Sequence, residues 1–432
     1  MKVNARRFKN HILTAIPFWT ASVITGFIAV IYAKLFQIAE DQITSIYTYN
    51  PYLIFLITPV CFVLAWLLVR FFAEYANGSG IPQVMVAVEM TSPDKKNVLS
   101  KLLNLKIAIV KILSSLLVVL GGGLVGREGP TIQVASSIFM SVSKLFPKWF
   151  PKFSKKNIIV SGAASGLAAA FNTPLGGIVF AIEELSKTHF KFTKTALFST
   201  ILIAGLTAQA IAGPYLYLGY PVIKNLPQYV IVGVFVTALV SGLLGAIMSK
   251  LILSLLNFSK KLNFRNKILY IVACSLLVAT IIFFSGTDSM CGGKELMNKL
   301  LFSTEKHTEW YMPFSRMAGM IFSFSTGASG GVFAPSLSVG ASIGGVISSF
   351  FNYNDSGVNL LVLCGMISFL TGVTRSPFTS AILVLEMTDR HSVILYFMLS
   401  AIIANLIANL IDERSFYEHL SENLKKNIAG FN

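Results

Sequence analysis

Residues 123–139 read GLVGREGPTIQVASSIF, a glycine-rich turn with an Arg–Glu pair and a proline, followed by an apolar run. Two other stretches share this form, GSGIP at 78–82 and GGVFAP at 330–335. Proline suits the start of a helix because its missing N–H has no intrahelical partner there, and glycine lets the backbone approach a ligand closely. Each stretch is therefore predicted to start a helix whose N-terminus has free N–H groups and about half a positive charge.

Helix N-termini of this kind bind anions without a fixed cation. Three of them, converging at membrane depth, would hold a dehydrated small anion. The alternative is that the three stretches are only kinks and caps in a packed helix bundle. One such motif alone would favour that alternative, but three of them favour the anion site.

The rest of the chain is far too apolar for a soluble domain. Of its 432 residues, 54% are apolar and only 12% are Asp, Glu, Lys or Arg, and the mean hydropathy is +0.70. Soluble domains carry about 25% charged residues. Four cysteines without CxxC spacing indicate no disulfide framework. Composition therefore excludes a soluble enzyme, a disordered chain and a disulfide scaffold, and predicts an all-α integral membrane protein.

Positive charge is in excess, with 35 Lys and Arg against 19 Asp and Glu. Nucleic-acid binding is one explanation, but the basic residues lie between apolar blocks, as at 1–10 and 144–156, and not in one basic domain. That distribution follows the positive-inside rule, by which Lys and Arg collect in cytoplasmic loops. We expect a lipid bilayer and no nucleic acid as partner. We also expect a bacterial inner (plasma) membrane location and two cytoplasmic termini, since the tail contains Lys425 and Lys426.

Two apolar blocks are broken by proline, at Pro174 and Pro377, and the segments around these breaks resemble each other. Residues 172–183 align with 375–386 at an offset of 203 residues, and a second match lies at an offset of 205. Broken helices at membrane depth are tolerated only where protein or a water-filled cavity covers the backbone. Duplicated halves with such breaks indicate a binding site between the halves, near the midplane.

These observations predict the organisation of the whole chain. We expect one transmembrane domain over 1–432, with approximate repeats at 12–222 and 226–411. Residues 412–432 are predicted to form a short C-terminal amphipathic helix, without a cytosolic regulatory domain.

Glu128 is the most informative single residue. A carboxylate inside a membrane is costly and indicates a function. A static ion pair with its neighbour Arg127 is the simple alternative. However, a carboxylate at a helix N-terminus is stabilised like a bound anion. Glu128 could therefore occupy the anion's place when charged and leave it when protonated.

GSGIP, GREGP and GGVFAP, in this order, resemble the three signature loops of the CLC family of chloride channels and chloride/proton antiporters. Residues 162–184 and 375–389 are also similar to that family, so the resemblance extends over about residues 70–420. It implies two inverted-topology repeats of tilted and broken helices in a homodimer. It implies chloride and protons as the transported ions, and no cofactor or metal.

The resemblance also implies roles for individual residues. Glu128 corresponds to the glutamate that gates the anion path and carries the proton. Ser79 corresponds to the anion-coordinating serine, and Tyr417 is the best match to the tyrosine that offers a second hydroxyl. Tyr417 could instead be an interfacial aromatic anchor. The further residues expected to bind the anion, mostly through backbone N–H groups, are Gly80, Ile81, Arg127, Gly129, Val332 and Phe333.

Glu184 bears on whether the protein is an antiporter or a channel. The simple interpretation of Glu183 and Glu184 is a helix end paired with Lys187 and Lys191. In CLC antiporters the second glutamate of this pair transfers protons, and channel members usually lack an acid there. Glu184 therefore favours chloride/proton exchange, with a passive chloride channel as the alternative.

The chain departs from well-known bacterial antiporters at Gln83 and Met85, where they carry acids. This departure alters the charge balance around Lys111, which resembles their buried lysine. An intramembrane enzyme is not expected, because the apolar blocks contain no HExxH motif, Ser/His pairing or His/Cys cluster. A membrane scaffold would not need three glycine-rich helix starts.

Overall fold

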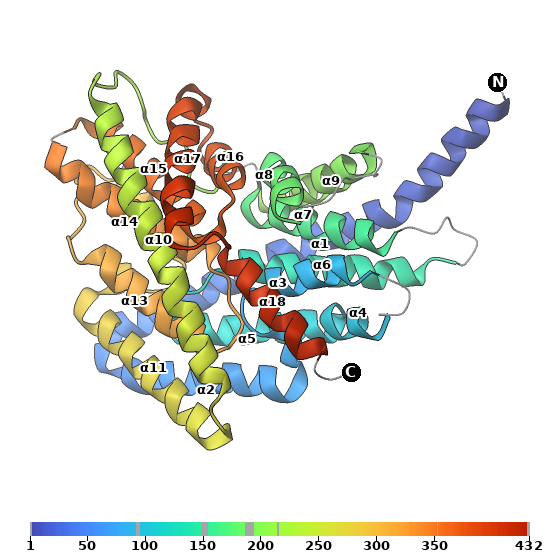
Figure 1. The fold of residues 1–432 in the computed structure, drawn as a ribbon, viewed down its shortest axis with the longest axis horizontal. Helices are drawn as coiled ribbons and strands as arrows, with labels where there is room; N and C mark the ends of the chain where they lie inside the picture. Colours follow the sequence, from blue (N-terminus) through green and yellow to red (C-terminus); the bar gives the residue numbers. More distant parts are fainter. Residues whose placement is uncertain are drawn as a thin grey trace.

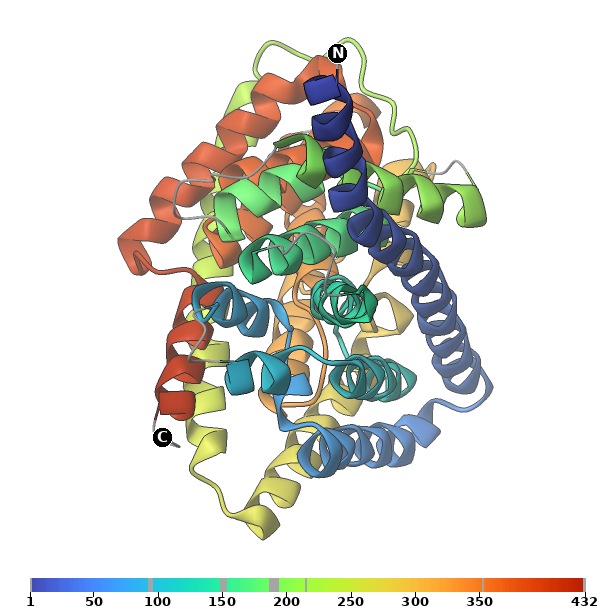
Figure 2. The same cartoon turned by 90° about the vertical axis from the view of Figure 1, so that its right-hand side faces the viewer.

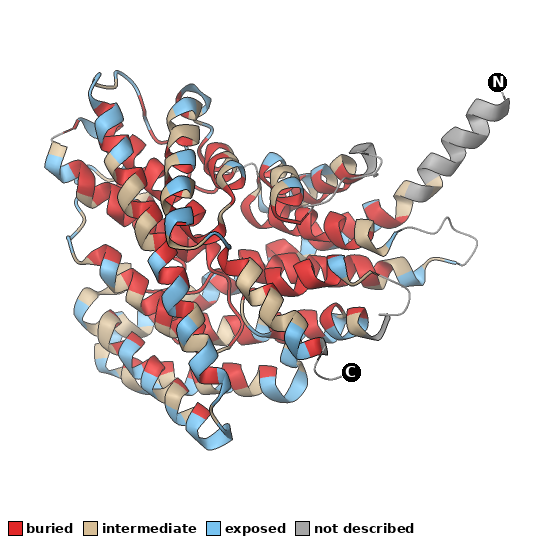
Figure 3. Cartoon of the chain, viewed as in Figure 1, coloured by how far each residue is buried: buried red, intermediate tan, exposed pale blue. Residues whose placement is uncertain are grey.

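The structure is a computed structural model, and it describes residues 2–91, 96–147, 154–185, 194–213, 216–351 and 353–429. Within these ranges every regular element is helical, and the strand-like pairings are two isolated bridges between loops. Apolar segments in lipid must satisfy their backbone groups internally, and helices do so. The helices surround a centre in which α6, α7, α14 and α15 are buried along most of their length (Figures 1 and 3).

The first half of the chain forms the following helices: α1 (Lys2–Tyr49), η1 (Pro51–Leu53), α2 (Ile54–Phe72), η2 (Glu74–Ala76), α3 (Ile81–Glu89), α4 (Lys96–Leu102), α5 (Leu105–Leu120), α6 (Glu128–Leu145), α7 (Lys155–Phe171), α8 (Pro174–Phe180), the π-helical turn η4 (Ala181–Leu185) and α9 (Lys194–Ala212). The N-terminal helix α1 runs along one side of the molecule (Figure 2).

The second half forms these helices: α10 (Val230–Lys260), α11 (Phe264–Ser285), η5 (Thr287–Ser289), α12 (Lys294–Phe302), α13 (Met312–Ser325), α14 (Phe333–Phe351), α15 (Asp355–Thr374), α16 (Pro377–Thr388), η6 (His391–Val393), α17 (Ile394–Ile411) and α18 (Phe416–Ala429). Asparagine side chains cap the N-termini of α5, α11 and α15 by accepting a backbone N–H. The C-terminal helix expected within 412–432 is present as α18.

Eight helices among the described residues are long and apolar enough to span a bilayer. One of them, α1, is longer than its apolar block at 12–35 indicates, because it continues to Tyr49. Glu40 and Asp41 end the apolar pattern but not the helix, and Glu40 accepts a hydrogen bond from the N–H of Gly292 (3.2 Å).

Both predicted proline breaks are present and have the same geometry. Helix α7 ends at Asn172 with φ 57°, and α15 ends at Arg375 with φ 59°. The next helices, α8 and α16, start at the two prolines. A residue with positive φ ends a helix, and proline then starts a new one in another direction.

The two broken regions contact each other reciprocally. Glu183 accepts hydrogen bonds from the N–H groups of Phe378 and Thr379 in the first turn of α16 (3.1 and 2.6 Å). Glu386 accepts two hydrogen bonds in the same way from the first turn of α8 (3.0 and 2.7 Å). Each carboxylate satisfies N–H groups that have no intrahelical partner. This symmetry supports the repeats at 12–222 and 226–411, whose boundaries stay a prediction.

Helices α14 and α15 pack through glycines with almost no space between their backbones. A Cβ on Gly365 would lie 3.0 Å from the carbonyl carbon of Gly340 and 3.1 Å from the nitrogen of Gly344, and it would overlap the Gly340 carbonyl oxygen. Small residues allow this close approach between membrane helices. Gly365→Ala is therefore expected to destabilise the fold by about 3 kcal/mol or more, since two backbones must separate.

Thermal unfolding in detergent measures this effect as a lower Tm. Gly292→Ala is the matched control, because the nearest atom to its added Cβ would lie at an ordinary 3.5 Å. An unchanged Tm for Gly365→Ala would contradict the packing described.

Candidate functional site

The three glycine-rich stretches are far apart in sequence and meet at the centre of the molecule. The N–H of Gly330 donates to the carbonyl of Gly78 (3.0 Å), which joins the third stretch to the first. Gly126 and Gly331 exchange two hydrogen bonds (2.8 and 2.7 Å), which join the third stretch to the second. The stretch at 330–335 therefore lies between the other two, and the helix starts of α3, α6 and α14 converge.

Glycine is required at this meeting point because the backbones nearly touch. A Cβ on Gly129 would overlap the hydroxyl oxygen of Ser79 and lie 2.9 Å from the Ser79 carbonyl oxygen. The first intrahelical hydrogen bonds of the three helices are donated by Val84, Thr131 and Ser336. The N–H groups before these residues thus have no intrahelical partner and face the centre, as predicted from the sequence.

The prolines lie slightly deeper in their helices than the sequence prediction placed them. Pro82 is the second residue of α3, while Pro130 and Pro335 are the third residues of α6 and α14. Proline still fits, because every N–H of the first turn lacks an intrahelical partner. Ile81, Glu128 and Phe333 are therefore the first helical residues.

Glu128 is 1% exposed, and its carboxylate lies where two helix N-termini meet. It lies beside its own backbone N–H and that of Ala334 in the first turn of α14, and its Oε2 atom is buried without a hydrogen-bond partner among the described residues. No ion pair joins Arg127 to Glu128 in the described residues, and the Arg127 guanidinium makes a long contact to the Ala170 carbonyl (3.5 Å). Backbone dipoles, rather than a static pair with Arg127, therefore hold the Glu128 carboxylate.

Glu128 and Arg127 also border a cavity of about 540 Å³, here named the Glu128 cavity. Its wall includes charged side chains from α1 and α12, among them Lys34, Glu40 and Lys294. The residue that carries the buried carboxylate thus borders a cavity with charged walls.

On the other side of the helix starts, two hydroxyl groups face the centre. Ser79 and Tyr417 are 1% and 0% exposed, and their hydroxyls lie close to each other. Within the described ranges neither hydroxyl oxygen has a hydrogen-bond partner. The Tyr417 ring stacks on Phe333 at 6.2 Å with an angle of 18°. Burial against Phe333 rules out an interfacial anchor for Tyr417 and places two polar donors beside the helix starts.

A cavity of about 100 Å³, here named the Ser79 cavity, is bordered by Ser79. It is lined by residues around the first loop and by parts of α10, α13 and α18, including Lys260 and Asn427. The loop that carries Ser79 therefore borders a different cavity from the one that Glu128 borders.

Lys111 supports the loop that carries Ser79. Its fully buried amino group donates to the carbonyls of Ala76, Asn77 and Gly78 (2.9, 2.9 and 2.8 Å). No acidic side chain pairs with Lys111 in the part of the chain that the structure describes. In place of an acid, Gln83 donates to the carbonyl and the side-chain oxygen of Asn77 (both 2.9 Å). The departures from the family pattern thus leave a buried cation held by backbone carbonyls.

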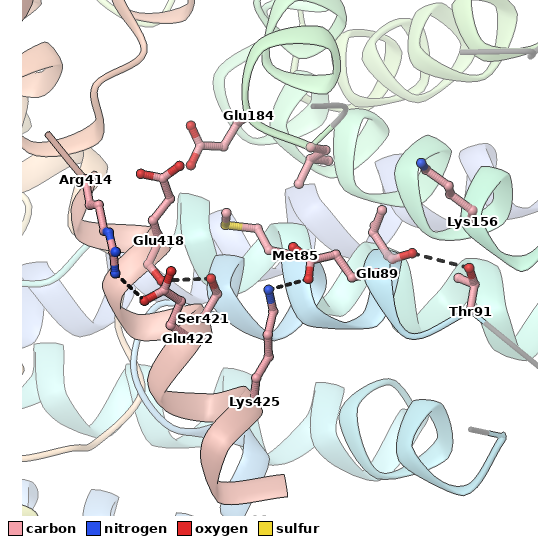
Figure 4. Close-up of a pocket in the computed structure, with 12 residues that line it drawn as sticks. Met85, Glu89, Thr91, Lys156, Glu184, Arg414, Glu418, Ser421, Glu422 and Lys425 are labelled. Carbon is pink, nitrogen blue, oxygen red and sulfur yellow. Dashed lines mark hydrogen bonds and ion pairs between the residues drawn. The ribbon is translucent and has the colours of Figure 1, made fainter. Parts of the chain in front are cut away.

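Glu184 lies in the π-helical turn η4 and is 6% exposed. Ser376, at the break between α15 and α16, donates its hydroxyl to a Glu184 oxygen (2.5 Å). Glu184 lines a cavity of about 550 Å³, here named the Glu184 cavity, together with residues of α3, α7 and α18 (Figure 4). Lys187 and Lys191, the lysines expected beside it, lie outside the described residues.

The sequence interpretation missed Ser376 as a partner of Glu184. The signal was present, because Ser376 precedes Pro377 as Thr173 precedes Pro174 in the matching segment. The family resemblance singled out Glu184, while the simple interpretation grouped Glu183 and Glu184 as one helix end. The structure separates them, since Glu183 binds the start of α16 and Glu184 faces the cavity.

The family profile described as "Voltage gated chloride channel" matches residues 60–409. The chain belongs to this family, the CLC family. Its CLC relatives include the H(+)/Cl(-) exchange transporters ClcA of Cronobacter sakazakii and Klebsiella pneumoniae (strain 342). Each is 27% identical over 384 residues, which cover 84% of this chain and 78% of the relative.

A solved structure of a slow cyanobacterial Cl-/H+ antiporter superposes with a TM-score of 0.83 at 22% identity. The match covers 95% of this chain and 98% of that one. The predicted all-α CLC fold is therefore confirmed, and the protein is an integral membrane protein.

Proposed function

We propose that the protein exchanges chloride for protons across a membrane. The observation that carries this proposal is the position of the Glu128 carboxylate at the converging N-termini of α6 and α14. An anion and a charged carboxylate are stabilised there by the same N–H groups and dipoles. Protonation removes the charge, so Glu128 leaves the site with its proton and chloride takes its place.

Chloride would bind between the backbone of the helix starts and the two buried hydroxyls. Ser79 and Tyr417 supply hydroxyl donors that have no other partner in the described residues. Backbone N–H groups would come from Gly80, Ile81, Gly129, Val332 and Phe333, which begin or precede the three helices. In this proposal Arg127 attracts anions from the Glu128 cavity, because a nearby cation raises the local anion concentration.

Protons would follow a different route on the other side. Glu184 is buried beside its own cavity and is positioned by Ser376, so it can pass protons between this cavity and Glu128. The Ser79 cavity gives chloride separate access. Separate routes that join only at Glu128 allow the two ions to move in opposite directions.

The distribution of Lys and Arg supports the orientation and location of this transporter. Basic segments at 1–10 and 144–156, and Lys425 on α18, would face the cytoplasm under the positive-inside rule. The Glu184 cavity, which contains Lys156 and Lys425, would then open to the cytoplasm and the Glu128 cavity to the outside. We propose a bacterial inner membrane location with both termini cytoplasmic.

A homodimer is proposed for the assembly. All residues of the proposed pathway belong to one chain, so each subunit of such a dimer would carry a complete pathway. Chloride, protons and lipid are the proposed partners, and no enzymatic reaction, cofactor or nucleic acid is part of the proposal.

Reconstitution into liposomes tests exchange against a passive channel. With equal pH inside and outside the liposomes, an outward chloride gradient should drive proton uptake. A pH electrode in the external solution measures this uptake after a potassium ionophore is added. A passive channel would move chloride and leave external pH unchanged. Replacing chloride with fluoride in the same assay tests which halide is carried.

Glu184→Gln is expected to remove proton uptake and to leave chloride efflux, because the amide keeps the shape but cannot carry a proton. Proton flux should fall at least about tenfold. Glu309→Gln, an exposed acid outside both large cavities, is the matched control. Unchanged proton uptake in Glu184→Gln would overturn the proposed proton route.

A further inference from the structure

Four acids, Glu89, Glu184, Glu418 and Glu422, line the Glu184 cavity, and two of them form ion pairs with basic side chains. Glu89 on α3 forms an ion pair with Lys425 on α18. Glu422, also on α18, forms one with Arg414 (2.7 Å). Lys156 of α7 lines the same cavity. The first ion pair connects α18 to α3, and the second joins α18 to the residue two positions before its start.

Glu418 also lines this cavity. It is on α18 and its side chain points toward the carboxylate of Glu184 (Figure 4). One of its oxygens accepts a hydrogen bond from the N–H of Ser415 (2.8 Å). Its neighbour in sequence is Tyr417, whose hydroxyl lies close to Ser79. One turn of α18 therefore presents a group to the proposed anion site and a carboxylate to the proposed proton route.

The other acid near Glu184 is bound to the start of α16. Glu183 accepts hydrogen bonds from the backbone of Phe378 and Thr379 and from the Thr379 hydroxyl (2.7 Å). Both oxygens of Glu183 are thus engaged at α16, whereas the carboxylate of Glu418 lies beside that of Glu184 in the cavity (Figure 4).

We propose that Glu418 is the proton-accepting group at the mouth of the Glu184 cavity and that it exchanges protons with Glu184. In this step a proton from cavity water protonates the Glu418 carboxylate. Glu418 then gives that proton to the Glu184 carboxylate, directly or through one water, and becomes charged again. Carboxylates that face each other favour states in which they share one proton, because like charges repel. The inference rests on the proposed function and adds a residue to it.

A structural role competes with this inference and can be separated from it. Glu418 and Ser415 form a capping box, in which the N–H of Glu418 donates to the Ser415 hydroxyl (3.1 Å) and the N–H of Ser415 donates to Glu418. Glutamine replaces glutamate in such boxes. Glu418→Gln therefore keeps the cap and removes the titratable group, whereas Ser415→Ala weakens the cap and keeps the carboxylate.

In the liposome assay, Glu418→Gln in the full chain should lower chloride-driven proton uptake at least about tenfold. Its chloride efflux and Tm should stay at the wild-type values. Ser415→Ala should lower the Tm and keep the wild-type ratio of protons to chloride. Glu422→Gln, one turn further along α18 and in the same cavity, should also keep that ratio.

A wild-type ratio in Glu418→Gln would overturn the inference. An equal loss of proton coupling in Ser415→Ala would also overturn it, because the effect would then come from the helix cap. An equal loss in Glu422→Gln would do the same, because the effect would then come from the total charge in the cavity. Absence of proton uptake in the wild-type protein is a different result, because it would overturn the proposed exchange function itself.

Discussion

Glu128→Gln is expected to abolish chloride-driven proton transport while chloride continues to cross the membrane. The amide is neutral at every pH, so it cannot carry a proton, and it does not compete with chloride for the N–H groups at the starts of α6 and α14. Proton uptake should fall to the level of empty liposomes, a loss of at least about a hundredfold. Chloride efflux from the same liposomes should no longer depend on pH.

Glu295→Gln is the matched control for this experiment. Glu295 lines the same cavity as Glu128 but is exposed at its rim on α12. It should keep the wild-type proton uptake. Persistent proton uptake in Glu128→Gln would show that another group carries the proton, and the mechanism proposed for this carboxylate would then be wrong.

Lys111→Met is expected to destabilise the protein and to weaken chloride binding. The substitution removes three hydrogen bonds, one to each carbonyl of residues 76–78, and each carbonyl keeps one other donor. A hydrogen bond from a charged donor contributes about 1.5–3 kcal/mol, so the free energy of unfolding should fall by about 3 kcal/mol or more. The same loop positions Ser79, and a buried positive charge near the anion site is lost with the lysine.

Thermal unfolding in detergent and calorimetric chloride titration measure these two effects. Lys106→Met is the matched control, because Lys106 lies on the same helix, α5, with an exposed side chain. A wild-type Tm together with wild-type chloride affinity in Lys111→Met would contradict the supporting role described for Lys111.

Several features of the fold and site could be predicted from local sequence. The breaks at Pro174 and Pro377 were predictable because proline cannot continue a helix. The starts of α3, α6 and α14 were predictable within two residues from glycine and proline, whose backbone preferences are local. The end of α1 was not, because Glu40 and Asp41 interrupt its apolar pattern while the helix continues to Tyr49.

In the site, too, some features depend on local sequence and others on contacts between segments far apart in the chain. Glu183 and Glu184 are adjacent and chemically identical, yet one binds the start of α16 and the other faces a cavity. Nothing in their own sequence separates them, because a π-helical turn and the position of α16 decide which side chain points where. For Tyr417, only packing against Phe333 distinguishes a buried side chain from a surface anchor.

The amino-acid sequence alone determined that this chain is a helical membrane protein. It also determined three helix N-termini of the kind that binds anions, one of which carries a glutamate. Composition and local backbone preferences suffice for that, because lipid admits few backbone arrangements. The tertiary structure decided that the three starts meet, that Lys111 is bound by carbonyls, and that Glu418 faces Glu184. These are contacts between segments far apart in the chain, and such contacts arise only when the helices pack against one another.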